Sequence, residues 1–337
     1  MTKQERIAAF AKLGEWLTHP DTETTEKTAQ FHHKNPWYTA DNVLRQMNAI
    51  GHQLTPEKLN AWIQDYTAQD SDKTVGLVLA GNLPLVGFHD ILSCLIMGFR
   101  VQVKLSSDDA GLTPFVISQL IRICPSFKDK IQEVDKLTNY DLVIATGSNN
   151  SARYFEYYFG KKPHIIRKNR NAVAVLTGQE TPQELTALGS DIFDYFGLGC
   201  RSVSKLYIPK NYPIANFFEA IEQFSPIREH FKYNNNYDYN KSIYLINKDK
   251  HYDNGFLLLK EDNTLSSPLA VVFYEEYNNT DQLIAAIEGQ KDNIQCVVCQ
   301  QDLQISPPLF RLGRSQHPAL NDYADGVNTL DFLAQHQ

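Results

Sequence analysis

Short apolar runs that alternate with longer helical segments constrain the fold of this chain most, and the alternation begins at Thr74. Residues 75–80, 100–105 and 141–145 have the length and the apolar composition of buried strands. The segments between them, such as 113–123, carry apolar residues at helical spacing. Strands separated by helices of this length pair in parallel through right-handed crossovers. The sequence therefore predicts an α/β fold.

The same alternation continues beyond residue 168, so we expect two α/β domains, 71–167 and 168–337, after a helical N-terminal segment at 1–70. No low-complexity linker separates the two domains. Residues 228–242 are rich in Asn and Tyr and are predicted to form a loop, followed by a strand near 242–246. The other strands predicted in the second domain are 172–176, 203–208, 256–259, 269–274 and 294–299.

The overall composition is that of a folded globular protein, with 42% hydrophobic and 21% charged residues among 337. The net charge of -7 disfavours a broad attraction to nucleic acid or to anionic lipid. The N-terminus lacks an apolar signal segment, and no run of about 18 apolar residues occurs, so we expect no stable membrane insertion. The five cysteines are odd in number and scattered, which is typical of a reducing compartment. The expected location is the cytoplasm.

The first candidate site residue is Asn82, which follows the predicted strand 75–80 in the sequence Gly81-Asn82-Leu83-Pro84. Open α/β sheets bind ligands beyond the carboxyl ends of their strands. A buried Asn at this position could donate its side-chain amide to a developing oxyanion. The alternative is a plain Gly-Asn turn with Pro in the first turn of a helix.

A second candidate is the turn Thr146-Gly147-Ser148, between the predicted strand 141–145 and a predicted helix at 149–159. Backbone N–H groups at such a helix N-terminus can bind a phosphate or a dinucleotide. A capped helix without a ligand is the alternative. The chain contains no Gly-x-Gly-x-x-Gly fingerprint, which disfavours a standard Rossmann binding loop.

The third candidate is Cys200, in the sequence Gly197-Leu198-Gly199-Cys200-Arg201-Ser202. Two glycines precede it, and the predicted strand 203–208 follows it. The glycines leave space around the sulfur, and Arg201 could favour the nucleophilic thiolate. The alternative is a buried structural cysteine. Cys296 and Cys299 have the spacing of half a zinc site but lie in an apolar strand without further ligands, so no metal site is expected.

In their order and spacing, these segments resemble the aldehyde dehydrogenase superfamily and, within it, the LuxC-type long-chain acyl-CoA reductases. The resemblance covers roughly residues 72–335. Asn82 is similar to the Asn of the family's Asn-Phe-Pro segment, which lines the oxyanion hole, and Gly199-Cys200 resembles the nucleophile motif. The run 101–107 is similar to the segment that carries the cofactor-binding lysine. The resemblance implies an aldehyde-dehydrogenase-like fold, with 71–167 as the nicotinamide-binding domain and 168–337 as the catalytic domain. The cofactor-binding residues that it implies are Lys104, Ser106, Ser107, Thr146, Gly147 and Ser148.

Two departures from the family pattern refine the expected chemistry. The oxidising members supply a Glu in a Glu-Leu-Gly-Gly motif as the base for thioester hydrolysis, whereas the corresponding stretch here, 163–169, contains no acid. The absence of this acid disfavours hydrolysis and favours acyl exchange between Cys200 and another thiol.

The second departure concerns the cofactor. Members that prefer NAD often carry a Glu three residues past the lysine, where this chain has Ser107. Without that carboxylate, and with Lys104 to attract a 2'-phosphate, the expected cofactor is NADPH, with NADH as the alternative.

The resemblance thus implies a reductase that transfers the acyl group of a fatty acyl-CoA to Cys200 and reduces it to an aldehyde with release of CoA. The alternatives are a reductase of an acyl phosphate or a carrier-bound acyl thioester, and a non-catalytic binding protein of the same fold. The expected partners are an acyl thioester substrate, a second copy of the chain or an acyl-transfer protein, and no nucleic acid. The aromatic run 154–159 could line an apolar tunnel or pack a helix into the core.

Overall fold

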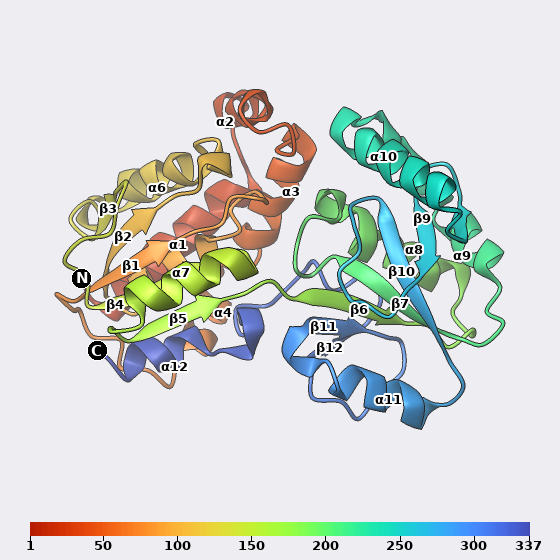
Figure 1. Cartoon of the computed structure of the whole chain (residues 1–337). Coiled ribbons are helices and arrows are strands. Elements are labelled where there is room, and N and C mark those ends of the chain that lie inside the picture. The colour runs from red at the N-terminus through yellow and green to blue at the C-terminus, as the bar shows by residue number, and fades with distance from the viewer. The chain divides into compact units, whose positions relative to one another are not determined.

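The computed structural model describes residues 1–337, apart from the side chain of Asn149, and divides into two compact units (Figure 1). The first unit comprises Met1–Asn169 together with Ala319–Gln337, and the second comprises Arg170–Pro318. Both contain parallel strands joined by helices, so the predicted α/β fold is confirmed. Among the helices of the described chain, none is long and apolar enough to cross a membrane.

A five-stranded parallel sheet forms the centre of the first unit, in the order β3-β2-β1-β4-β5. The chain runs outward from β1 to β3 and then returns to place β4 on the other side of β1. The strand order therefore reverses between β1 and β4, which is the topological switch point of this sheet. The strands are β1 (Thr74–Val78), β2 (Arg100–Lys104), β3 (Ile131–Glu133), β4 (Leu142–Thr146) and β5 (His164–Arg167).

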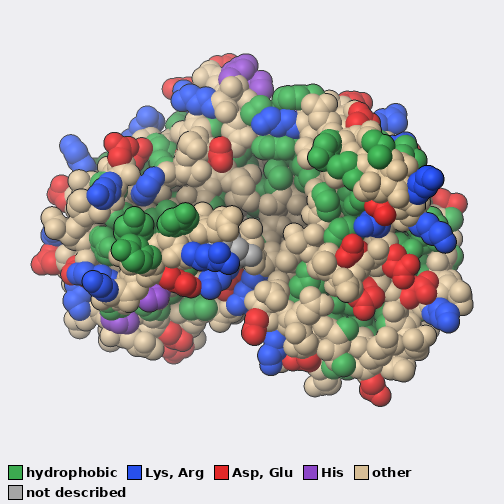
Figure 2. Space-filling model, in the orientation of Figure 1, with side chains coloured by type: hydrophobic (Ala, Val, Ile, Leu, Met, Phe, Trp, Pro, Cys, Tyr) green, Lys and Arg blue, Asp and Glu red, His purple; other side chains and the backbone are tan. Residues whose placement is uncertain are grey.

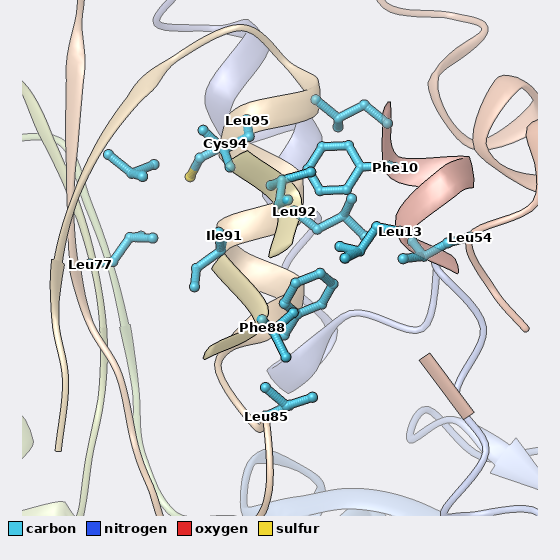
Figure 3. Packing of buried hydrophobic residues seen from close by; sticks show 14 of the residues in the cluster. Phe10, Leu13, Leu54, Leu77, Leu85, Phe88, Ile91, Leu92, Cys94 and Leu95 are labelled. Atoms are coloured by element: carbon cyan, nitrogen blue, oxygen red, sulfur yellow. The ribbon is translucent and has the colours of Figure 1, made fainter. Parts of the chain in front are cut away.

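Helices cover both faces of this sheet. The helices of the first unit are α1 (Lys3–Thr18), α2 (Thr22–Thr28), α3 (Ala40–Gly51), α4 (Pro56–Ile63), α5 (Phe88–Ile96), α6 (Leu112–Ile123), α7 (Asn149–Phe159) and α12 (Thr329–Ala334). On one face, Leu77 of β1 joins a large buried cluster with Ile91 of α5 and Phe10 of α1, and Figure 3 shows α5 between the strands and α1. The N-terminal helices therefore share a core with the sheet.

The opposite face of the same sheet is covered by α7, which contains the aromatic run. Phe155 and Phe159 pack against the buried Val143 and Ala145 of β4. Tyr154, Tyr157 and Tyr158 point away from this core and are 67%, 80% and 68% exposed. Figure 2 shows hydrophobic side chains gathered over α7 on the surface of this unit. The run thus divides into a core face and an exposed face.

The last residues of the chain return to the first unit, although the sequence pattern assigned all of 168–337 to one domain. Leu330 and Leu333 of α12 are fully buried in the cluster that contains α5. Arg167 at the end of β5 donates a hydrogen bond from Nη2 to Thr329 Oγ1 (2.9 Å) and forms an ion pair with Asp90 of α5 (2.5 Å). Burial of two leucines and this polar contact explain why the C-terminal segment belongs with the first sheet.

The second unit is built on a seven-stranded sheet, in the order β12-β11-β6-β7-β10-β9-β8, in which only the β8–β9 pair is antiparallel. Its strands are β6 (Asn171–Val175), β7 (Val203–Pro209), β8 (His251–Asp253), β9 (Leu258–Glu261), β10 (Val271–Tyr277), β11 (Ile294–Val298) and β12 (Leu309–Phe310). Its helices are α8 (Pro182–Phe193), α9 (Ile214–Ala220), α10 (Phe231–Asn247) and α11 (Thr280–Glu288).

Helix α10 occupies the region where the sequence predicted a loop at 228–242 and a strand near 242–246, so both predictions are wrong. The many Asn residues obscured a helical spacing of buried tyrosines at positions 233, 237 and 244. Two of these hydroxyls find partners inside the unit: Tyr233 donates to the carbonyl of Phe256 (3.0 Å) and Tyr237 to Asp253 (2.6 Å). Satisfied hydroxyls allow a polar sequence to form a buried helical face.

Candidate active site

The carboxyl edge of the first sheet gathers most of the predicted site residues. Val78 of β1 pairs with Lys104 of β2, and β1 pairs with β4 on its other side, so the carboxyl ends of these three adjacent strands are in register. Lys104 and Thr146 are the last residues of β2 and β4. The edge includes the switch point between β1 and β4, where open α/β sheets bind their ligands.

The turn after β4 is fixed by backbone and side-chain hydrogen bonds. The N–H of Gly147 donates to the carbonyl of Arg167 (3.3 Å), and Ser148 Oγ accepts from the N–H of Ser151 (3.2 Å) as the N-cap of α7. A Cβ on Gly147 would lie only 2.8 Å from Phe155 and 2.9 Å from Ser151. Glycine is therefore required for this close approach of turn and helix, and the exposed Ser148 lies at the helix N-terminus.

The loops after β1 and β2 lie directly against each other. A Cβ on Gly81 would lie 2.8 Å from the nitrogen of Asp109 and 2.9 Å from Cβ of Ser106. Ser106 Oγ accepts from the N–H of Asp108 (3.2 Å) and so caps a short turn of 3-10 helix, Ser107–Asp109. Lys104 and Ser107 are exposed on this edge. Burial raises the pKa of Asp109, although hydrogen bonds from Thr113 to its carboxyl oppose the rise.

Asn82 lies in the loop after β1 and is exposed, whereas the sequence reasoning placed a buried Asn there. Two residues of the N-terminal segment hold this region. The fully buried Tyr38 directs its hydroxyl at the carbonyls of Gly81 and Leu83, each at 2.9 Å, and Asn35 donates to the carbonyl of Asp108 (2.8 Å). No sequence pattern marks Tyr38 or Asn35, because their partners are more than 40 positions away along the chain.

Cys200 belongs to the second unit, where it lies on a four-residue turn that precedes β7. The N–H of Ser202 donates to the carbonyl of Gly199 (2.9 Å), and Ser202 Oγ accepts from the N–H of Gly199 (3.2 Å). Both ends of the turn are thus tied together, with Cys200 and Arg201 in its middle. The side chain of Cys200 is exposed, and the guanidinium of Arg201 lies over the ring of Phe310 (5.5 Å).

The backbone just before this turn is strained. Tyr195 and Phe196 have φ values of 54° and 60°, and Gly197 follows at 76°, so three consecutive residues are left-handed. This conformation is unfavourable for residues with a bulky side chain, and it persists only where surrounding contacts hold it. Such strain is common at functional sites.

A hollow of about 220 Å³ lies beside the Cys200 turn within the second unit. Its lining includes residues on both sides of the turn, among them Leu198 and Val203, with Tyr233 of α10 and Leu269 before β10. Most of the lining side chains are apolar. A mainly apolar lining is common in small-molecule sites.

The remaining cysteines differ from Cys200 in their exposure. Cys94, Cys296 and Cys299 are buried, and burial raises the pKa of Cys94 and Cys299 above the ordinary thiol value. Cys124 is partly exposed. The described side chains contain no group of three or more His, Cys, Asp or Glu residues that could hold a metal ion.

Solved structures with the same fold are aldehyde dehydrogenases. The chain is similar to aldehyde dehydrogenase 21 of Physcomitrella patens in complex with succinate (TM-score 0.67, 14% identity), over 99% of this chain and 84% of that one. It is similar to the NAD+ complex of an aldehyde dehydrogenase from Bacillus cereus (TM-score 0.60, 13% identity), over 89% of this chain and 72% of that one. It is also similar to an NAD-dependent aldehyde dehydrogenase from Sinorhizobium meliloti (TM-score 0.63, 12% identity), over 86% of this chain and 68% of that one.

At these identities the similarity establishes the fold, which is that of the aldehyde dehydrogenases, as the sequence resemblance predicted. No protein-family model and no curated protein sequence matches the chain.

Proposed function

We propose that the protein is an NADPH-dependent acyl-CoA reductase of the LuxC type, which forms a thioester between Cys200 and a fatty acyl group and reduces it to the aldehyde. The observation that carries the proposal is the exposed cysteine on a tied turn beside an apolar hollow, in a chain with an aldehyde dehydrogenase fold. An exposed thiol can reach a substrate carbonyl, which the three buried thiols cannot.

The Cys200 thiolate attacks the carbonyl carbon of the acyl-CoA, and the bond to the CoA sulfur breaks. CoA leaves as a thiolate, and the acyl group remains on Cys200 as a thioester. On the sequence resemblance alone, we propose the amide of Asn82 and the backbone N–H of Cys200 as the donors to the oxyanion of this step. Neutral, preorganised donors of this kind are effective in acyl transfer.

The residues that we assign to the cofactor are Lys104, Ser106, Ser107, Thr146, Gly147 and Ser148. They lie at the carboxyl edge beside the switch point of the first sheet, and this arrangement fits a dinucleotide. The structural neighbour from Bacillus cereus was solved with NAD+. The exposed Lys104 would attract a 2'-phosphate, and Ser107 would not repel it, which favours NADPH. A cofactor held by these residues would supply the hydride that reduces the thioester to the aldehyde, and Cys200 would leave as the thiolate.

Reduction of the acyl-enzyme, rather than its hydrolysis, is proposed because this chain has no acid in the stretch that carries the base in the oxidising family members. Residues 163–169 contain no acidic side chain, and the strand β5 in this stretch ends at Arg167, whose guanidinium is occupied by Asp90. Without a carboxylate to activate water, the acyl-enzyme is protected from hydrolysis and is available for reduction.

The acyl group that we propose is a fatty acyl chain, since the hollow beside Cys200 is lined mainly by apolar side chains. Reductases of acyl phosphates or of carrier-bound acyl thioesters remain the alternatives, because the same thiol could attack each of these donors. We further propose that the protein acts in the cytoplasm, as a homo-oligomer or with an acyl-transfer partner.

A panel of acyl donors tests this proposal. Purified protein is mixed with NADPH and a long-chain acyl-CoA, an acyl phosphate or an acyl carrier protein thioester, and oxidation of NADPH and release of the leaving group are followed together. The proposal predicts stoichiometric NADPH oxidation and CoA release with acyl-CoA, both lost in Cys200→Ala. Activity confined to another donor would favour the alternative reductases. No reaction of Cys200 with any donor would indicate a non-catalytic protein.

A further inference from the structure

We propose that Ser202 and Gln316 are positioning residues that set the conformation of the Cys200 turn, and that Asp191 anchors the segment that carries Gln316. This inference rests on the proposed function of Cys200 as the nucleophile. It is carried by a chain of hydrogen bonds that begins at the turn and ends in helix α8, all within the second unit.

The first contact in this chain is made by Ser202, which is only 4% exposed. Its Oγ accepts from the N–H of Gly199 (3.2 Å), on the other side of Cys200. The same oxygen accepts a second hydrogen bond from Nε2 of Gln316 (3.1 Å). One hydroxyl therefore links the start of the turn, its end and a distant segment of the chain.

The second contact depends on how Gln316 itself is held. Gln316 is 8% exposed and lies 114 positions from Ser202 in the sequence. The carboxylate of Asp191, in α8, accepts from the N–H of Gly313 (2.5 Å) and from both the N–H (2.9 Å) and the hydroxyl (2.7 Å) of Ser315. Asp191 and Ser315 are fully buried. A buried carboxylate with several donors is a rigid anchor for a loop.

The strained backbone before the turn must be held by surrounding contacts, and the anchored segment provides one of them. The left-handed run at Tyr195, Phe196 and Gly197 leads directly into the turn and would relax if the surrounding contacts were weakened. The hydrogen bonds that Ser202 Oγ accepts from Gly199 and Gln316 hold the other side of the same turn. A nucleophile displaced by about 1 Å can lose about 10²-fold in rate, so these two residues would control the reactivity of Cys200 without touching the substrate.

The test compares Ser202→Ala and Gln316→Met with wild type and with Ser93→Ala. Ser93 is also a buried serine with one hydrogen bond, to the carbonyl of His89 (2.7 Å), but it belongs to helix α5 of the first unit. Alkylation of Cys200 by iodoacetamide is followed by mass spectrometry of the Cys200 peptide, and kcat and KM are measured with NADPH and acyl-CoA.

We expect Ser202→Ala and Gln316→Met to change the alkylation rate of Cys200 by about tenfold or more and to lower kcat by up to about 10²-fold with little change in KM. Ser93→Ala should match wild type in both measurements. Wild-type alkylation rates in both Ser202→Ala and Gln316→Met would overturn the positioning role. Altered alkylation in a protein that reduces no acyl donor would overturn the proposed function and leave the positioning role intact. If Ser202→Ala does not fold, Gln316→Met decides alone.

Discussion

The buried ion pair between Arg167 and Asp90 allows a quantitative prediction about the first unit. The two side chains are each 6% exposed, and Arg167 Nη1 lies 2.5 Å from Asp90 Oδ2. Arg167→Met leaves the carboxylate of Asp90 buried without a countercharge, which costs ~3–5 kcal/mol when a buried pair is broken. The hydrogen bond from Arg167 to Thr329 is lost as well, but it contributes only ~1 kcal/mol and does not move the total outside this range. We expect the free energy of unfolding to fall by about 4 kcal/mol.

The double variant Asp90→Leu with Arg167→Met should recover most of this loss. Asp90 Oδ1 and Arg167 Nε have no hydrogen-bond partner among the described residues, so the pair is incompletely satisfied in its buried site. Replacing an incompletely satisfied buried pair by apolar side chains is often neutral or stabilising. We expect the double variant to lie within ~1 kcal/mol of wild type.

Urea denaturation followed by tryptophan fluorescence measures the free energy of unfolding of the first unit, which contains the Arg167–Asp90 pair. All three tryptophans, Trp16, Trp37 and Trp62, lie in the first unit. Arg100→Met is the matched control, because the Arg100–Asp72 pair is exposed and should contribute little. A single variant Arg167→Met as stable as Arg100→Met, or a double variant as unstable as the single one, would refute the reasoning.

Three further predictions concern the proposed site. Asn82→Ala should lower kcat by about 10²–10³-fold with little change in KM, as measured by steady-state NADPH oxidation, because one oxyanion donor is removed. Ser107→Glu should lower kcat/KM for NADPH relative to NADH by about tenfold or more, because its carboxylate repels the 2'-phosphate, whereas the neutral Ser107→Gln should not. Burial raises the pKa of Asp191 to about 6 from its ordinary 3.8, so the folded state holds this proton more tightly than the unfolded state. Wild type should therefore lose stability relative to Asp191→Asn as the pH rises from ~4 to ~7, by up to ~3 kcal/mol in urea denaturation.

Different results would contradict each of these expectations. A rise in KM alone for Asn82→Ala would mean that Asn82 contacts the substrate but not the oxyanion. Equal cofactor preference in Ser107→Glu and Ser107→Gln would mean that Ser107 does not lie near the 2'-phosphate of the cofactor. A stability difference between wild type and Asp191→Asn that stays constant with pH would show that the hydrogen bonds from Gly313 and Ser315 cancel the effect of burial on the pKa of this carboxyl.

The sequence predicted the regular part of the fold because its signals are local. Strands such as β1 and β7 are short apolar runs, and α8 begins with the Thr181–Pro182 start and the Glu184 of a capping box. The parallel order followed from their alternation with helices. Helix α10 was missed because tyrosines and asparagines form its buried face, where the usual apolar residues are absent. Its stability depends on partners such as Phe256 and Asp253, which no local pattern reveals.

The candidate site was predictable only where a residue is marked by its neighbours in sequence. The two glycines just before it, Gly197 and Gly199, identified Cys200, and the strand ends identified Asn82 and Lys104. The contacts that hold these loops come from far along the chain, as Tyr38 does for the Asn82 loop and Gln316 for the Cys200 turn. Single hydrogen bonds between distant segments leave no periodic signal, so only the folded structure shows them.

The central claim, that Cys200 carries the acyl group, is tested most directly by trapping the acyl-enzyme. Protein without NADPH is incubated with a long-chain acyl-CoA, and its intact mass and peptide masses are compared with those of Cys200→Ser. The account predicts one acyl group per chain, located on the Cys200 peptide, released as aldehyde on addition of NADPH and absent as a thioester from the variant. Acylation of another residue, or NADPH-dependent aldehyde formation that persists in Cys200→Ser, would contradict it.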